Sequence, residues 1–362
     1  MAKYTLAEVC EKLLAARAAL AQGQRLGDAC KAAGLSPGTY KKWQVTYAAL
    51  DLPHWVVAAP HRGALALSGD GRRVFTAADT PEGLTLTRHD AATGAATARA
   101  EHPASRDPGA WREVLAAVSD ATGARLRFLL TGGEIFTWDV GRGEITKAPH
   151  DLREGCVPLT GRASSGARRW ASATLSPDLT RVAYWETLGD RDTRAPARLC
   201  VRDLGDGAVV MRHETAPMFI QAPLVFHPTR GRLATFDDNK LVTVLDLDAR
   251  RAIVEGGPQV HSVAFGPGDL LVCDDWYGHT LEFDLATGAR RQLCAAWGSH
   301  LSLGDRYACV STYFVEVRSR RDDQAVRRIA METIVEAQLS PDGATLAVLT
   351  DRLCVWHLGP SD

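Results

Sequence analysis

The segment AQLSPDGATLAVLTDRLCVWHL, residues 337–358, decides the fold of most of this chain. Its Ser340-Pro-Asp-Gly343 has the composition of a tight turn, because proline fixes φ and glycine accepts a positive φ. Apolar runs flank this turn, and a short polar turn separates the second run from a third that ends at Trp356-His357. The segment therefore predicts three consecutive antiparallel strands joined by short turns.

The same unit recurs along residues 51–362. Each turn is paired with a strand end that carries an Asp or another polar residue: Ser68–Gly71 with His89-Asp90, Ser119-Asp120 with Trp138-Asp139, Ser176–Asp178 with Arg202-Asp203, His227-Pro228 with Leu245-Asp246, Gly266–Asp269 with Phe283-Asp284, Leu303–Asp305 with Val317-Arg318, and Ser340–Gly343 with Trp356-His357. Asp139, Asp203, Asp246 and Asp284 lie 64, 43 and 38 residues apart. Since propeller blades repeat about every 40–45 residues, seven units predict seven blades stacked in a ring. The longest interval contains two insertions, around residues 150–169 and 186–196.

These units resemble the repeats of bacterial WD-repeat proteins over about 300 residues, although only Trp138-Asp139 keeps the literal dipeptide. The resemblance implies an all-β, seven-bladed β-propeller for residues 51–362. The last unit ends after its third strand, Leu353–Leu358, so its fourth strand must come from elsewhere in the chain. We expect Trp55-Val-Val-Ala58, which precedes the first unit, to supply that strand and to close the ring.

The composition favours a globular protein of the cytoplasm. Of 362 residues 46% are hydrophobic, yet no apolar run approaches the roughly 18 residues that cross a bilayer, so no membrane contact is expected. The 8 cysteines are scattered without a Cys-x-x-Cys pair, which indicates reduced, buried thiols. Residues 1–50 carry seven Lys/Arg and three Asp/Glu, a net of +4, and the remainder carries 35 and 40, a net of −5. We call residues 1–50 the head. A basic head attached to a mildly acidic remainder is the charge distribution expected of a head that binds phosphate groups.

Residues 1–50 predict three helices. Thr5-Leu6-Ala7-Glu8 is a capping box for a first helix that ends near Gly23. A short second helix covers about 26–33, and Gly34 suits the tight turn that follows. Ser36 and Pro37 are a natural N-cap and first residue for a third helix, which is expected to reach about Leu50.

The head also resembles the N-terminal DNA-binding segment of insertion-sequence transposases. The residues that carry the likeness are Gly23, Ala29-Cys30, Ala33-Gly34-Leu35-Ser36, Thr39-Tyr40, Trp43, Tyr47 and Leu50. The likeness implies a helix-turn-helix whose third helix enters the major groove, whereas the transposase nuclease domain is missing. One departure is Lys41-Lys42, which replaces the second member of the Tyr-Tyr or Tyr-Arg pair that the family carries before the tryptophan and could alter base preference.

We expect Tyr40, Trp43 and Tyr47 to face the core of the head. The residues expected to contact DNA are Arg25, Lys31, Gly38, Thr39, Lys41, Lys42 and Gln44. Lysines reach phosphate or guanine, and Thr and Gln read base edges. The alternative is a three-helix docking module with a solvated basic face.

Aromatic residues in the connections between second and third strands predict a docking patch on one rim of the propeller. These residues are Trp185, Trp276, Tyr277 and Tyr313, and exposed aromatics are typical anchors of protein interfaces. The alternative is that at least one of them packs between blades. Two basic stretches, Arg162–Trp170 and Arg318–Arg328, are interpreted as a solvated loop and a solvated edge strand.

No catalytic motif was recognised, whether nucleophile elbow, phosphate-binding loop, zinc-binding helix or dinucleotide fingerprint. The acidic runs Asp237-Asp238-Asn239 and Asp274-Asp275 are interpreted as tight turns rather than metal sites. No cofactor and no metal are therefore expected.

The sequence favours a non-catalytic DNA-binding adaptor in a regulatory, mobile-element or defence setting. In this hypothesis residues 1–50 contact DNA and the propeller rim docks a protein partner. A pure protein–protein scaffold with a docking or dimerising head is the main alternative, and a propeller enzyme is the third. A homo-oligomer stays open, because a single small head neutralises few phosphates.

Overall fold

The computed structural model describes residues 4–46, 52–58, 63–80, 83–103, 114–150, 152, 173–187, 196–217, 223–236, 239, 241–255, 259–266, 268–275, 279–295, 299–303, 305–311, 314–322, 324–331 and 334–358. The expected insertion at Arg162–Trp170 and the acidic pair Asp237-Asp238 lie outside these residues. So does the junction at residues 47–51, and the domain boundary between residues 50 and 51 therefore stays a prediction.

The described residues of the head form three helices, α1 (Leu6–Ala21), α2 (Leu26–Ala32) and α3 (Pro37–Thr46). The capping box is present in both directions, since the Thr5 side chain accepts from the Glu8 amide and Glu8 accepts from the Thr5 amide. Val9, Leu13 and Ala16 of α1 form the centre of the head's core with Cys30 and Tyr40. The helices are therefore held by packing as well as by their caps.

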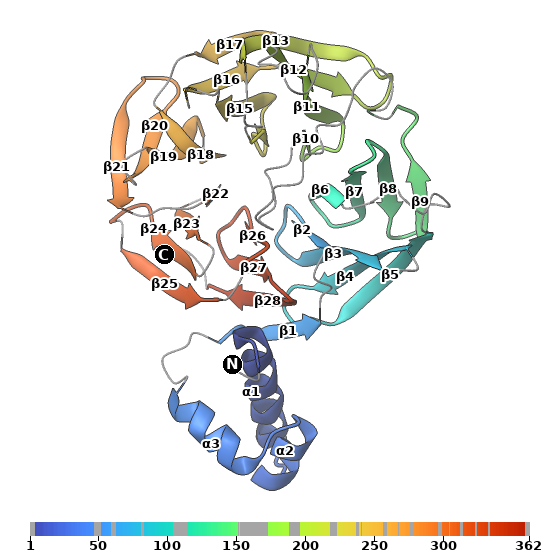
Figure 1. Ribbon diagram of the computed structural model, residues 1–362, viewed down its shortest axis with the longest axis vertical. Helices are drawn as coiled ribbons and strands as arrows, with labels where there is room; N and C mark the ends of the chain where they lie inside the picture. Colours follow the sequence, from blue (N-terminus) through green and yellow to red (C-terminus); the bar gives the residue numbers. More distant parts are fainter. Residues whose placement is uncertain are drawn as a thin grey trace.

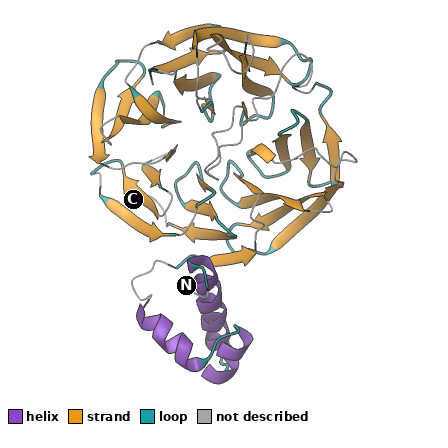
Figure 2. Cartoon of the chain, viewed as in Figure 1, coloured by secondary structure: helices purple, strands orange, loops and turns teal. Residues whose placement is uncertain are grey.

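The described strands form seven four-stranded antiparallel sheets, which are the blades of a ring (Figures 1 and 2). Blade 1 contains β2 (Gly63–Leu67), β3 (Arg73–Thr80), β4 (Gly83–Asp90) and β5 (Ala96–Pro103). Blade 2 contains β6 (Val114–Ser119), β7 (Arg125–Leu130), β8 (Ile135–Asp139) and β9 (Glu144–Lys147). Blade 3 contains β10 (Ala173–Leu175), β11 (Arg181–Thr187), β12 (Pro196–Asp203) and β13 (Val209–Pro217). Blade 4 contains β14 (Val225–Phe226), β15 (Arg232–Phe236), β16 (Val242–Asp246) and β17 (Arg251–Val254).

Blade 5 contains β18 (Val260–Phe265), β19 (Leu270–Asp275), β20 (His279–Asp284) and β21 (Arg290–Ala295). Blade 6 contains β22 (Ser299–Leu303), β23 (Arg306–Val310), β24 (Phe314–Ser319) and β25 (Ala325–Ala330). Blade 7 contains β26 (Glu336–Leu339), β27 (Thr345–Leu349), β28 (Arg352–His357) and, as its outer strand, β1 (Trp55–Ala58). The seven-bladed β-propeller expected from the repeats is confirmed.

The ring closes as the sequence predicts. Strand β1 pairs antiparallel with β28, with Trp55 opposite Val355 and Ala58 opposite Arg352. The Trp55 indole Nε1 donates to the Ala91 carbonyl of blade 1 at 2.6 Å. A Cβ on Gly94 would lie 2.7 Å from the Trp55 ring, so only glycine fits that turn. The residue that begins the closing strand thus also ties blade 7 to blade 1.

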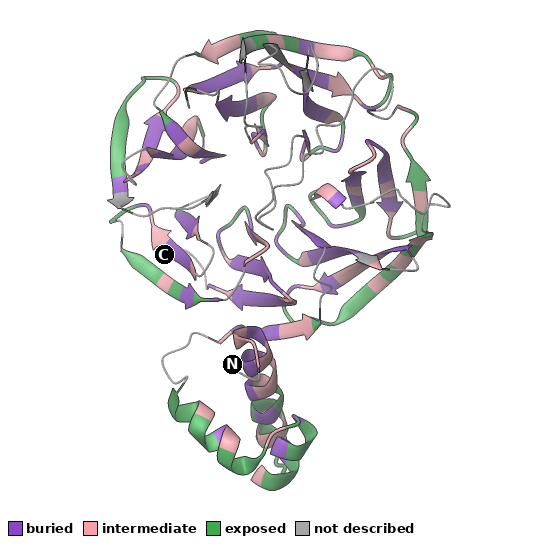
Figure 3. Ribbon diagram, in the orientation of Figure 1, coloured by how far each residue is buried: buried purple, intermediate pink, exposed green. Residues whose placement is uncertain are grey.

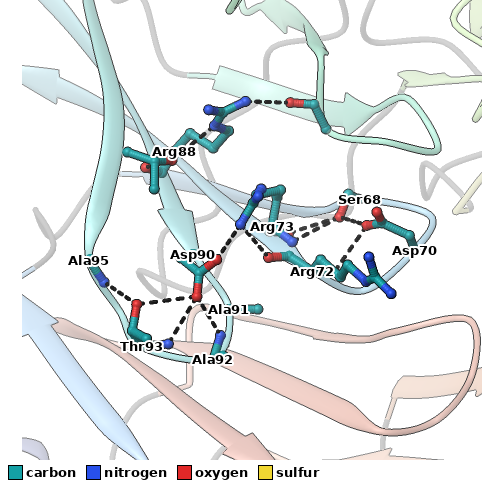
Figure 4. A network of polar contacts seen from close by, with 12 residues as sticks. Ser68, Asp70, Arg72, Arg73, Arg88, Asp90, Ala91, Ala92, Thr93 and Ala95 are labelled. Atoms are coloured by element: carbon teal, nitrogen blue, oxygen red, sulfur yellow. Dashed lines mark hydrogen bonds and ion pairs between the residues drawn. The ribbon is translucent and has the colours of Figure 1, made fainter.

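The turns that define the repeat share one hydrogen-bond pattern. In blades 1, 3 and 7 the turn serine donates to the aspartate two residues on, at 2.6, 2.6 and 2.5 Å. Its hydroxyl also accepts from the first amide of the second strand. Asp90 organises the other end of blade 1, where it accepts from the amides of Ala92 and Thr93 and pairs with Arg73 (Figure 4). Fixed turn chemistry of this kind sets the register of these three blades.

Aromatic side chains of the third strands pack between neighbouring blades. Trp138 of β8 is fully buried and meets Phe75 of blade 1 edge to face, with ring centroids 6.0 Å apart. Trp356 of β28 is fully buried in a cluster with Val315 of blade 6. Figure 3 shows how burial is distributed over the blades, with mostly buried inner strands and mostly exposed outer strands. Most of the core therefore lies between sheets rather than at the centre of the ring.

The interpretation of Asp274 as a turn residue was wrong, and the solvated edge strand expected over Arg318–Arg328 holds only in part, since Arg321 and Arg328 are exposed but Arg320 is not. Asp274 is buried within β19 rather than in a turn, and it accepts from Ser262 and Thr280 at 3.2 and 3.3 Å. Arg320 is buried at the end of β24, where it pairs with Glu282 of blade 5. Tertiary partners compensate for the burial of both charged side chains, which hydropathy alone assigns to solvent.

Candidate functional site

A short turn fixes α3 relative to α2. Gly34 has φ +64, and the Leu35 amide donates to the Cys30 carbonyl at 2.8 Å, which ends α2. Ser36 then begins α3, because its hydroxyl accepts from the Thr39 amide at 3.0 Å. The two helices are thus joined by a turn with little freedom.

One side of α3 packs on the head. Tyr40 is buried, and the half-buried Trp43 meets Tyr4 edge to face at 5.4 Å between centroids. The core positions expected at Tyr40 and Trp43 are therefore confirmed, and Tyr47 lies outside the described residues. Packing on this side determines which side of α3 stays in solvent.

The opposite side of α3 is basic and exposed. Gly38, Lys41, Lys42 and Val45 follow the i, i+3, i+4, i+7 spacing of one helix face, and all four are exposed. Among the described residues, neither lysine forms an ion pair. Val45 is 80% exposed, the largest exposed fraction among the large hydrophobic residues described. We call these four residues the α3 face.

The other residues expected to contact DNA lie near this face but differ in freedom. Arg25 and Lys31 are exposed at the two ends of α2. Thr39 is half-buried against Ser36, with hydroxyl oxygens 2.8 Å apart. Gln44 is exposed, although its amide donates to the Tyr40 hydroxyl at 2.9 Å. The structure thus presents Arg25 and Lys31 freely, and holds Thr39 and Gln44 through local hydrogen bonds.

The head is docked on blade 7 through the first turns of α1. Ala7 packs in the cluster that contains Cys354 and Trp356. The Thr5 hydroxyl donates to Asp351 at 3.1 Å. The guanidinium of Arg352 lies 3.1 Å from the Glu11 carboxylate and 3.9 Å from that of Glu8. A head held by apolar and charged contacts has a set orientation relative to the ring.

This docking surface was missed by sequence reasoning. Glu8 was recognised only as a capping residue, and nothing local distinguishes Arg352 or Glu11 from solvated surface charges. The one sequence signal that points to docking is the shortness of the junction between head and first strand.

The expected docking patch on the propeller rim needs one correction. Trp185 lies within strand β11, not in the connection that follows it, and its side chain is 4% exposed. It packs with Leu199 and Phe236 in the core between blades 3 and 4, as the blade-packing alternative has it. Trp276, Tyr277 and Tyr313 lie outside the described residues, so their place on the rim stays a prediction.

The described residues hold no cluster of three His, Cys, Asp or Glu side chains arranged for a metal ion. Within the same residues, no helix has the length and apolar character needed to cross a membrane. Cys10 and Cys273 are neutral thiols, since burial raises the pKa of Cys10 to about 11 and that of Cys273 to about 12.

No protein-family model matches the chain, and no curated protein matches its sequence. Solved structures do resemble its fold. A chain of the crystal structure of the mitotic checkpoint complex superposes with a TM-score of 0.59 at 15% identity, over 85% of this chain and 95% of that one. The β-propeller domain of Cps50 (Swd1) from Myceliophteria thermophila superposes with a TM-score of 0.56 at 13% identity, over 83% and 98%. At these identities the likeness establishes the propeller fold alone.

Proposed function

We propose that this protein is a non-catalytic DNA-binding adaptor, in which the α3 face contacts DNA and the propeller docks a protein partner. The observation that carries the proposal is the α3 face itself. It contains two exposed lysines that form no ion pair with the described residues, a glycine that allows close approach of a ligand, and a highly exposed valine. The helix that carries them is fixed by a tight turn. Lysines suit phosphates, glycine exposes backbone, and an apolar side chain suits a thymine methyl.

Binding of full-length protein to a fluorescein-labelled duplex, measured by anisotropy over a range of salt concentrations, tests the DNA contact. Lys41→Glu/Lys42→Glu is expected to abolish binding or to lower the salt slope by about 1.8, since each lost phosphate contact lowers it by about 0.9. Arg99→Glu/Arg142→Glu changes the charge by the same amount on exposed residues of blades 1 and 2 and serves as the matched control. Equal binding by the head variant and the wild type would refute the DNA contact.

The protein-docking half of the proposal rests on the fold. A propeller exposes many loops on a rigid ring, and one similar structure is a chain of a multiprotein complex. The anchors proposed are Trp276, Tyr277 and Tyr313, whereas the buried Trp185 is set aside. Cross-linking of wild type and a Trp276→Ala/Tyr277→Ala/Tyr313→Ala variant in host extract should capture one partner with the wild type only. Equal capture by both would place the partner elsewhere.

A pure scaffold is the second candidate, and the exposed Val45 favours it, because a bare valine also suits a protein surface. In that case neither the wild type nor the lysine variant binds DNA at low salt. Loss of a protein partner in a Val45→Asp variant would then place the head in a protein interface.

A further inference from the structure

Two adjacent blades carry an unusual outer strand. Strands β21 (sequence RRQLCA) and β25 (AVRRIA) each contain two arginines and no carboxylate. By contrast, β5, β9 and β13 each mix basic residues with a glutamate, β17 has a single arginine, and β1 has no charged residue. The outer strands of blades 5 and 6 are therefore the most basic of the seven described outer strands.

On both outer strands, an exposed arginine pairs with a mostly buried glutamate of the neighbouring strand. Glu282 of β20 lies opposite Arg291 and within 3.0 Å of it, and Glu316 of β24 lies opposite Arg328 at 3.9 Å. The glutamate side chains are 11% and 10% exposed, whereas those of Arg291 and Arg328 are 52% and 68% exposed. The negative charge thus lies beneath the surface and the positive charge on it.

Two further arginines extend this surface. Arg290 is exposed, with its guanidinium 5.8 Å from the centre of the Phe283 ring. Arg321 has a side chain that is 67% exposed, beside Asp305 at 3.1 Å. Arg290, Arg291, Arg321 and Arg328 together are called the basic arc. The buried Arg320, which pairs with Glu282 across the blades, holds the two halves of the arc together.

The blade 6 half of the basic arc adjoins blade 7, the blade on which the head is docked. Arg327 of blade 6 donates to the His357 carbonyl of blade 7 at 3.2 Å, and α1 docks on that same blade 7. In Figure 1, α3 lies on the side of α1 toward β25. In Figure 3, α3 and much of β21 and β25 are exposed. A fixed head therefore stands beside an exposed basic surface of the ring.

We propose that the basic arc binds the phosphate backbone of the same duplex that the α3 face contacts, so that the propeller extends the DNA footprint. The inference rests on the proposed function of the head. Arginine suits this role because its planar fork binds phosphate oxygens through two donors. A second set of phosphate contacts would also offset the weak binding expected of one small head.

The test compares duplexes of 14 and 40 base pairs with full-length protein, because the longer duplex extends further from the head along the ring. Arg290→Gln/Arg321→Gln/Arg328→Gln keeps the side-chain stems and removes three charges. The salt slope on the 40-base-pair duplex should fall by about 2.7, or about 0.9 for each contact, with no change on the shorter duplex. Arg72→Gln/Arg99→Gln/Arg142→Gln on blades 1 and 2 is the matched control and should leave both slopes unchanged. Circular dichroism melts verify that each variant folds.

An unchanged slope on the longer duplex would overturn the basic arc and leave the α3 face intact. Conversely, loss of slope in the arc variant together with wild-type binding by Lys41→Glu/Lys42→Glu would support the arc and refute the head's role. No binding of either duplex by the wild type at low salt would overturn both.

Discussion

Replacing Trp55 by alanine tests whether β1 closes the ring. The indole is buried, rests against Gly94, and makes a hydrogen bond with the Ala91 carbonyl. Removing a buried Trp side chain costs about 3–5 kcal/mol, and leaving a buried carbonyl unpaired adds about 1 kcal/mol. A loss of about 4–6 kcal/mol is a large part of the total stability of an ordinary domain, about 5–15 kcal/mol.

Urea unfolding followed by far-ultraviolet circular dichroism measures this loss, because the chain's nine tryptophans make fluorescence ambiguous. Trp55→Phe is the matched control, since it keeps an aromatic ring in the site but loses the hydrogen bond and part of the packed ring, and it should cost less than Trp55→Ala. Val326→Ala on the exposed face of β25 should change the free energy of unfolding by less than about 0.5 kcal/mol. If Trp55→Ala costs less than about 1 kcal/mol, the closing strand does not stabilise the ring.

Three further predictions concern the head and buried titratable groups. Arg352→Met should lower the free energy of unfolding by no more than about 1 kcal/mol, as expected for a partly exposed ion pair. The backbone amides of α1 should nevertheless exchange with deuterium faster in this variant. Unchanged exchange would show that the ion pairs of Arg352 with Glu11 and Glu8 do not anchor the head. Burial lowers the pKa of His227, and its Nδ1 accepts from two backbone amides, so the unfolded chain binds more protons below about pH 6.5. The free energy of unfolding should therefore fall as the pH drops below about 6.5. His227→Asn, which keeps a hydrogen-bond acceptor, should make that fall smaller when it is measured by urea titrations at several pH values. An equal pH dependence in the variant and the wild type would exclude His227 as the cause. Since burial raises the pKa of Cys10 to about 11 and that of Cys273 to about 12, iodoacetamide at pH 8 should label both only in urea, and rapid labelling of the folded protein would contradict their burial.

The fold was predictable because each repeat contains its own local signal. The Ser-Pro-Asp turns and the aspartate that ends the third strand act within a few residues, so a single sequence reveals them. The closing strand followed from the same logic, since Leu353–Leu358 needed an outer partner and Trp55–Ala58 was the apolar segment left unassigned.

The errors arose where distant residues decide the outcome. Trp185 precedes polar residues that resemble a loop, but pairing across β11 and β12 extends the strand and buries the ring. Asp274 resembles half of an acidic turn, yet two hydroxyl groups of neighbouring strands satisfy it. The docking of α1 depends on Arg352, more than 300 residues away in sequence. A local sequence pattern cannot predict such a contact, because its two residues are distant in sequence and are brought together by the closed ring.

A photo-crosslinking residue at position 45 would report directly whether the α3 face lies against DNA. Val45 is the most exposed large hydrophobic residue described, so substitution there leaves the packing of the head intact. If the α3 face contacts DNA, we expect a covalent adduct with labelled duplex from position 45 and none from position 18, which is exposed on α1. Equal adducts at the two positions, or none at position 45 in protein that binds the duplex, would contradict it.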